Sequence, residues 1–124
     1  MPLSTLADSK TFEVDGFTIR PLAAPSRGSA ELSLWSMELD PGAQSVAHQM
    51  DREEVFLLVT GQVSATISGE EVTAAPGDAI IVPAGSHLQL RNDSQDQPAT
   101  MTAVTSVGMR ATIGDETFAP PWTL

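Results

Sequence analysis

Alternation of hydrophobic and polar residues runs through most of the chain and predicts short β-strands. Between residues 31 and 39, Trp35, Met37 and Leu39 fall on one face, whereas Ser36 and Glu38 fall on the other. This is the two-residue period of a half-buried strand. No stretch of about eleven residues shows the period of an amphipathic helix. Further runs of strand length lie at residues 10–14, 17–19, 55–59, 63–67, 71–74, 79–82, 88–90 and 101–107.

Glycines and prolines, nine of each, separate these runs. Asp15-Gly16 predicts a two-residue hairpin turn, because glycine accepts the positive φ that this turn requires. Many short strands joined by tight turns are typical of an antiparallel sandwich or barrel. Residues 119–124 contain two adjacent prolines and are expected to be irregular. They form either a disordered end or an arm that docks Trp122 on a partner, and docking is favoured because an exposed indole is costly.

Composition narrows the functions that such a barrel can have. The chain has 16 acidic and 6 basic residues and a formal net charge of −10. It therefore lacks the basic surface that binds nucleic acid or an anionic membrane. The absence of cysteine removes disulfides and thiolate chemistry. No apolar stretch reaches the roughly 18 residues of a membrane span, and no secretory signal pattern is present at the start, so we expect a cytoplasmic domain.

From Gly42 onward the residues resemble the two sequence motifs of the cupin superfamily. The first motif has the form G-x5-H-x-H-x3–4-E-x6-G, and residues 42–61 match it with Gly42, His48, Glu54 and Gly61. Only the second histidine differs, because Met50 occupies its position. In a strand, residues 48 and 50 share one face, so both are expected to point into the barrel.

The second motif has the form G-x5-P-x-G-x2-H-x3-N, and residues 77–92 match its other fixed positions. Leu88 stands where the family has its metal-binding histidine, and His87 precedes it by one residue. The resemblance implies one all-β cupin domain over residues 1–124, an antiparallel jelly-roll (double-stranded β-helix) barrel. Residues 1–30 would form an N-terminal hairpin and arm, and residues 108–124 a C-terminal tail.

Metal-binding members of the family use two histidines and a glutamate from the first motif and a histidine from the second. This chain keeps His48 and Glu54 of that set. The period of two places His87 on the face opposite Leu88, directed outward, unless a shorter turn shifts the register and brings it inward. Two ligands are fewer than the three protein ligands usual at a catalytic metal. No cofactor is therefore favoured, although a divalent first-row metal remains an alternative.

The two substitutions make the predicted barrel interior apolar. An apolar concavity with a few polar groups is the general form of a small-molecule site. Equally, the same side chains can simply fill a small barrel, and the sequence leaves both possibilities open. Arg20, Arg27 and Arg52 could line the barrel mouth. The candidate ligand-binding residues are Trp35, Met37, Met50, Phe56, Leu88 and Leu90.

Three functions remain open. The first is a metal-independent acid–base enzyme of isomerase, lyase or cyclase type, in which His48 and Glu54 act on a small organic ligand. Hydrogen bonding to the Glu54 carboxylate would raise the pKa of His48. The second is a metal-dependent oxygenase or isomerase that uses the same two residues together with either a register-shifted His87 or water. The third is a non-catalytic ligand binder or sensor, with Trp122 in the tail reporting the bound state.

One strand is apolar on both of its faces, which favours a homodimer. Val55, Leu57 and Val59 alternate with Glu54, Phe56 and Leu58. Because Glu54, Phe56 and Leu58 are directed into the barrel core, the apolar residues of the opposite face are expected to be buried against another surface. A second copy of the chain is the simplest cover, and cupins commonly pair as dimers.

Overall fold

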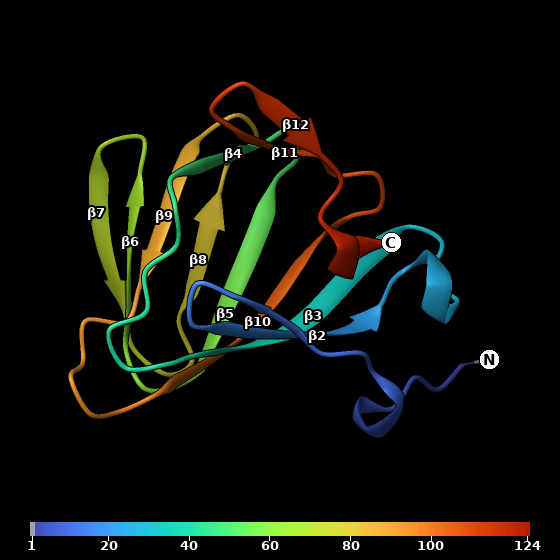
Figure 1. Ribbon diagram of the computed structural model, residues 1–124, viewed down its shortest axis with the longest axis horizontal. Coiled ribbons are helices and arrows are strands. Elements are labelled where there is room, and N and C mark those ends of the chain that lie inside the picture. Colours follow the sequence, from blue (N-terminus) through green and yellow to red (C-terminus); the bar gives the residue numbers. More distant parts are fainter. Residues whose placement is uncertain (1) are drawn as a thin grey trace.

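The computed structural model describes residues 2–124 and consists almost entirely of β-strands (Figure 1). Three short 3-10 helices accompany them, η1 (Leu6–Asp8), η2 (Pro25–Arg27) and η3 (Pro121–Thr123). The strands are β1 (Phe12–Val14), β2 (Phe17–Ala23), β3 (Leu32–Leu39), β4 (His48–Met50), β5 (Glu54–Thr60), β6 (Val63–Ile67), β7 (Glu70–Ala74), β8 (Ala79–Val82), β9 (His87–Arg91), β10 (Ala99–Ser106), β11 (Ala111–Ile113) and β12 (Glu116–Phe118).

Two antiparallel sheets of six strands each face one another. One has the strand order β1-β2-β3-β10-β5-β8, and the other β12-β11-β4-β9-β6-β7. Figure 1 shows the two sheets enclosing a common interior, with the C-terminal hairpin lying beside β4 at one end. This arrangement confirms the predicted all-β, antiparallel jelly-roll class.

The core follows the alternation that the sequence predicts. In β3 the buried positions include Trp35, Met37 and Leu39, and in β10 they include Met101 and Ala103. These residues face the same interior because β3 and β10 pair in continuous register from one end to the other. The inner faces of the two sheets therefore form one apolar core rather than two.

Two turns show why glycine stands where it does. Asp15 and Gly16 have φ of 52° and 83°, as the predicted hairpin turn between β1 and β2 requires. At Gly61, which has a φ of +83°, an added Cβ would lie 2.7 Å from the carbonyl oxygen of Pro98 and 2.9 Å from Ala99. Any side chain at Gly61 would thus push β5 away from the start of β10.

The C-terminal segment corrects the sequence prediction. Residues 108–124 were expected to be a tail and 119–124 to be irregular, but they contain the hairpin β11–β12 and the helix η3. Pro121 begins η3, where its fixed φ is compatible with a helical turn and its missing N–H costs nothing. The chain end is held by hydrogen bonds from Ser26 N to Leu124 O at 2.8 Å and from Ser33 Oγ to Thr123 O at 3.1 Å. Trp122 thus docks on its own barrel rather than on a partner.

The outward face of β5 and β8 carries exposed apolar side chains. Leu57 is 44% exposed, Val59 50% and Ile81 60%, whereas Glu54 and Phe56 on the inner face are buried. This is the two-faced strand that the sequence predicts. Pairing of two copies over this face stays a prediction. Within residues 2–124, no helix is long and apolar enough to cross a membrane.

Candidate functional site

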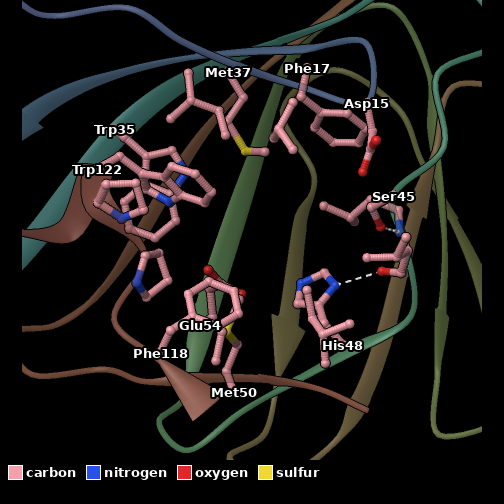
Figure 2. A pocket seen from close by; sticks show the side chains of 18 of the residues that line it. Asp15, Phe17, Trp35, Met37, Ser45, His48, Met50, Glu54, Phe118 and Trp122 are labelled. Atoms are coloured by element: carbon pink, nitrogen blue, oxygen red, sulfur yellow. Dashed lines mark hydrogen bonds between the residues drawn. The ribbon is translucent and has the colours of Figure 1, made fainter. Parts of the chain in front are cut away.

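The barrel is hollow at the end where β4, β11 and the C-terminal segment meet the first sheet. A cavity of about 240 Å³ lies there, and both sheets contribute to its walls (Figure 2). The question that the sequence left open, a filled or a hollow barrel, is thereby answered. The cavity is lined by Val14, Asp15, Phe17, Ile19, Trp35, Met37, Ser45, Val46, His48, Met50, Glu54, Phe56, Leu90, Ala111, Ile113, Phe118, Pro120, Pro121 and Trp122.

Aromatic rings make up much of this lining. The chain has two tryptophans and four phenylalanines, and all of them except Phe12 line the cavity. Phe12 packs edge-on against Trp122, with ring centroids 6.2 Å apart and an interplanar angle of 62°. The lining contains no lysine or arginine. A ligand of this cavity therefore meets flat apolar surfaces and few polar groups.

Glu54 is the buried acid of the site. It begins β5, on the same face as Phe56, and its side chain is directed into the barrel at 1% exposure. Its Oε1 atom has no hydrogen-bond partner among the described residues. Because burial penalises the charged form, the pKa of Glu54 is raised to about 8. At neutral pH the carboxyl group is therefore mostly protonated and can donate a proton.

His48 is the candidate base, on the opposite sheet. Its Nδ1 lies 2.8 Å from the carbonyl oxygen of Val46. A carbonyl oxygen only accepts, so Nδ1 carries the hydrogen in the neutral ring and Nε2 keeps its lone pair. Desolvation lowers the pKa of His48, an effect that the hydrogen bond to Val46 partly offsets. The imidazole is therefore mostly neutral at pH 7.

This geometry corrects the predicted pairing of the two residues. We expected His48 to bond to Glu54 and its pKa to rise, but His48 bonds to Val46 and its pKa falls. The reason is topological. His48 lies in β4, which pairs with β9 and β11, whereas Glu54 lies in β5, which pairs with β10 and β8. Figure 2 shows both side chains directed into the cavity from these separate walls.

The second motif supplies no ligand for a metal. Leu88 pairs with His48, and His87 pairs with Gln49, so the register is the one that directs His87 outward. His87 is exposed, and Leu88 is 1% exposed within the core. Met50 places a thioether in the cavity wall. Among residues 2–124 no group of three or more His, Asp or Glu side chains is arranged to hold a metal ion, so the residues present do not fit the family's metal centre.

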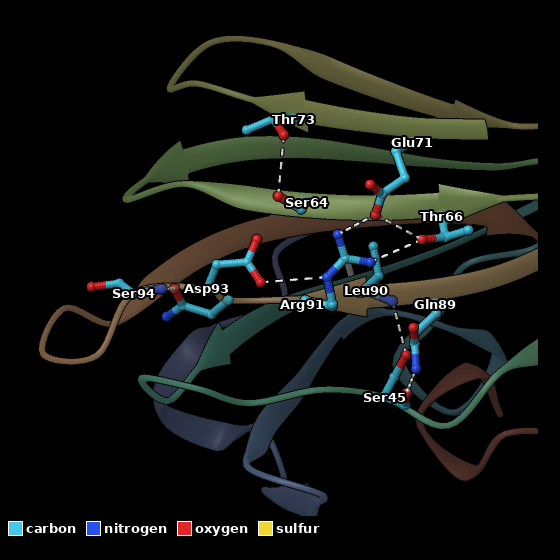
Figure 3. A network of polar contacts seen from close by, with 11 residues as sticks. Ser45, Ser64, Thr66, Glu71, Thr73, Gln89, Leu90, Arg91, Asp93 and Ser94 are labelled. Carbon is cyan, nitrogen blue, oxygen red and sulfur yellow. Dashed lines mark hydrogen bonds and ion pairs between the residues drawn. The ribbon is translucent and has the colours of Figure 1, made fainter. Parts of the chain in front are cut away.

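The outward side of β9 is occupied by a polar network instead. Arg91 makes ion pairs with Glu71 at 2.6 Å and with Asp93 at 3.4 Å, and it donates a hydrogen bond to Thr66 Oγ1 at 2.9 Å (Figure 3). These contacts tie β9 to β6 and β7 on the surface of the barrel. They lie outside the cavity and belong to the structure of the sheet.

Five of the six predicted ligand-binding residues line the cavity, and Leu88 does not. Its side chain fills the packed part of the core beside the cavity. The arginines proposed for the barrel mouth are also absent from the lining. Arg27 donates to Ser4 Oγ and Thr5 O, which fastens the N-terminal arm, and Arg52 donates to Val107 O. The five residues that do line it are Trp35, Met37, Met50, Phe56 and Leu90.

Sequence reasoning missed the two segments that close the cavity. The β1–β2 hairpin contributes Asp15 and Phe17, and the C-terminal segment contributes Phe118, Pro120 and Trp122. The only signal was the argument that the Trp122 indole should be docked. Nothing in the spacing of residues 108–124 indicated that the surface on which it docks is the mouth of the chain's own barrel.

Trp35 is a further polar group of the site. Its side chain is 2% exposed and lines the cavity, yet Nε1 has no hydrogen-bond partner among the described residues. Buried indole N–H groups usually find one. Two buried polar atoms, Trp35 Nε1 and Glu54 Oε1, are therefore unsatisfied in the lining of one cavity.

Fold and site together define a small antiparallel barrel with an internal, mainly apolar binding cavity. A family model described as a cupin domain matches residues 35–105, which is more than half of the chain. The protein therefore belongs to the cupin family. No curated protein matches it in sequence.

Solved structures with the same fold include proteins with different described activities. The polyketide cyclase RemF from Streptomyces resistomycificus is 20% identical with a TM-score of 0.75, over 86% of this chain and 79% of that chain. A sugar phosphate isomerase of the cupin superfamily from Silicibacter pomeroyi is 22% identical with a TM-score of 0.74, over 93% and 83%. An RmlC-like cupin from Shewanella frigidimarina is 17% identical with a TM-score of 0.73, over 86% and 90%. At these identities the likeness shows the fold alone.

Proposed function

We propose that this cupin is a metal-independent acid–base catalyst for a small, uncharged and largely apolar molecule. The observation that carries the proposal is the arrangement of two neutral groups, the Glu54 carboxyl and the His48 imidazole, on separate walls of one apolar cavity. A substrate between them would have a proton donor on one side and a proton acceptor on the other. This is the requirement of general acid–base catalysis.

Each group has one role. The Glu54 carboxyl gives its proton to a substrate oxygen, and His48 Nε2 takes a proton from a neighbouring carbon. For an enolisable ketone, the C–H bond breaks, its electron pair forms the enol double bond, and the carbonyl oxygen becomes a hydroxyl. Glu54 is left as a carboxylate and His48 as an imidazolium, and the reverse transfers restore both. Isomerase, lyase and cyclase reactions that pass through an enol share this step.

The charge of the cavity disfavours an anionic substrate, because the lining contains the Asp15 carboxylate and no lysine or arginine. A phosphate group is bound by cationic side chains or by the N–H groups of helix N-termini. The lining has no lysine or arginine, and helix η3 begins there with Pro120 and Pro121, which have no N–H group to donate. Activity of the kind described for the Silicibacter pomeroyi protein, a sugar phosphate isomerase, is thus poorly supported here. The aromatic lining better suits ring-containing molecules. A polyketide cyclase with the same fold, as described for RemF, is the more compatible precedent.

The test is hydrogen exchange into 1-indanone, a bicyclic ketone with acidic α-hydrogens. Protein in D2O should accelerate replacement of these hydrogens by deuterium, followed by NMR. His48→Gln and Glu54→Gln should each lower the rate by about 100-fold or more. His87→Gln is the matched control, because it changes an exposed imidazole outside the cavity, and it should leave the rate unchanged. Exchange that is equally fast in the His48→Gln protein would overturn the proposal.

The pH dependence of the same rate is a second readout. Activity needs neutral His48, so it should fall on the acid side, below the ordinary histidine value of 6.5. It also needs protonated Glu54, so it should fall again as pH rises through about 8. Glu54→Gln should lack the alkaline decline. Exchange that is lost on chelation and restored by a first-row divalent metal would instead support the metal-dependent alternative.

A further inference from the structure

Two buried polar atoms in the cavity lining lack partners, and they lie on the same sheet. Trp35 is in β3 and Glu54 is in β5, and β10 runs between these strands. Ala103 of β10 pairs with Trp35 on one side and with Phe56 on the other. Glu54 lies two residues before Phe56 in β5 and pairs with Thr105 of β10, and Figure 2 shows Trp35 and Glu54 on one side of the cavity.

The chemistry of these atoms restricts what can satisfy them. An indole Nε1–H donates and never accepts, so its partner must be an acceptor. A protonated carboxyl group also presents a donor. The wall formed by β3 and β5 therefore offers two donors and needs acceptor atoms from the ligand.

The aromatic lining also suits a different class of ligand, an organic cation. Five rings and the Asp15 carboxylate border the cavity, the chain carries a net charge of −10, and cations bind the faces of aromatic rings. A cation, however, has no acceptor for Trp35 Nε1–H and would leave that atom buried and unsatisfied. The Trp35 indole therefore separates the two classes of ligand.

We propose that the ligand is an uncharged, ring-containing molecule with an acceptor oxygen, such as a ketone or quinone, and that Trp35 Nε1–H is the group that selects it. This inference rests on the proposed function for the protonated state of Glu54, and it adds the substrate class and a specificity-determining residue. Trp35 binds and orients the oxygen-bearing face of the ligand, whereas proton transfer belongs to Glu54 and His48.

The experiment compares three probes with the same bicyclic skeleton, namely indane, 1-indanone and 1-aminoindane. They present no polar group, an acceptor oxygen and an ammonium group, respectively. Dissociation constants are measured at pH 7 by isothermal titration calorimetry. The wild-type protein should bind 1-indanone about tenfold more tightly than indane, the difference expected for one neutral hydrogen bond that satisfies a buried donor. It should bind 1-aminoindane most weakly.

Trp35→Phe removes the N–H group and keeps an aromatic ring. It should bring the Kd values of 1-indanone and indane to within about threefold of each other while changing the Kd of indane little. His87→Gln is the matched control, since it alters an exposed side chain outside the cavity and should leave the ketone preference intact. The wild-type comparison remains decisive if Trp35→Phe folds poorly.

Equal wild-type affinity for 1-indanone and indane would overturn the inference. Tightest binding of 1-aminoindane would overturn it in favour of a cation site. The proposed function has a separate test: it is rejected if His48→Gln does not slow deuterium exchange into 1-indanone. A ketone preference that disappears in Trp35→Phe, together with exchange unaffected by His48→Gln, would retain the ligand class and reject the catalytic roles.

Discussion

The two cupin motif segments, residues 42–61 and 77–92, build the same barrel but contribute unlike side chains to it. The first directs His48, Met50 and Glu54 into the cavity. The second directs Leu88 into the packed core and His87 to the surface. His48 and Leu88 are paired directly across β4 and β9, so the difference is one of side chain and not of position.

This contrast distinguishes the residues that form the barrel from the residues that are proposed to act on a ligand inside it. Strand pairing depends on backbone hydrogen bonds, on turns and on an apolar inner face. A leucine at position 88 satisfies the inner face fully, so the register does not depend on a metal. The proposed chemistry, in contrast, depends on a few polar side chains whose burial in this apolar interior lowers the stability of the folded protein. Glu54, whose pKa burial raises to about 8, is the clearest example.

The largest expected effect comes from truncating the packed position. Leu88→Ala should lower the free energy of unfolding by about 4 kcal/mol, because it creates a void in a core that is otherwise filled. Met50→Ala removes a side chain that already borders the cavity and should cost about 2 kcal/mol. Urea denaturation at pH 7 measures both. Equal losses would show that Leu88 borders open space as Met50 does, and the contrast between the segments would disappear.

Glu54→Gln should change stability in a pH-dependent way. Folding favours the protonated carboxyl, since the pKa is about 8 in the folded state against an ordinary value of 4.5. Wild-type stability should therefore fall as pH rises from about 4.5 to 8. At pH 9 the glutamine variant should be more stable than wild type by several kcal/mol, and below pH 4.5 the difference should largely vanish. Parallel stability curves for the two proteins would contradict the isolated, buried carboxyl.

The fold could be predicted from the sequence because its determinants are local. Alternation in residues 31–39 and 63–67 and the turn at Asp15-Gly16 each specify structure within a few residues. The same period of two placed His87 outward and Leu88 inward, as the structure shows. Short strands such as β11 and β12 have too few residues to show a period, so the alternation does not distinguish them from an irregular tail.

The site was only partly predictable, because alternation identifies a face but not the space in front of it. The alternation does not indicate whether Trp35 and Phe56 enclose a cavity or fill the barrel, because that depends on the distance between the two sheets. Nor could it reveal that Trp122 closes the cavity. The first cupin motif places His48 and Glu54 together in the barrel interior, which predicts direct contact between them. They lie in separate sheets, and His48 uses the nearby carbonyl of Val46 instead.

Asn92 tests the structural role of the second motif. Its side chain is 2% exposed, and Nδ2 lies within hydrogen-bond distance of the carbonyl oxygens of Leu39, Asp40 and Gln97, at 3.2, 3.2 and 2.8 Å. Asn92→Ala leaves these carbonyls without that donor and should cost about 2 kcal/mol by urea denaturation. The residue does not line the cavity, so the affinity for 1-indanone should be unchanged in the folded variant. A large loss of affinity would assign the second motif a part in binding.

The smallest expected effect completes the contrast between the two imidazoles. His87→Ala removes an exposed ring whose residue is anchored through its backbone, by a hydrogen bond from His87 N to Ser68 Oγ at 3.2 Å. Stability should change by no more than about 0.5 kcal/mol, as for most surface substitutions. Deuterium exchange into 1-indanone should be as fast as in wild type. The paired His48→Ala protein should lose that exchange, because only His48 presents a free Nε2 to the cavity. If both substitutions slowed exchange to the same extent, His48 and His87 would both take part in catalysis. The observed register, which directs His87 outward, would then be inconsistent with the activity, and so would the separate roles of the two motif segments.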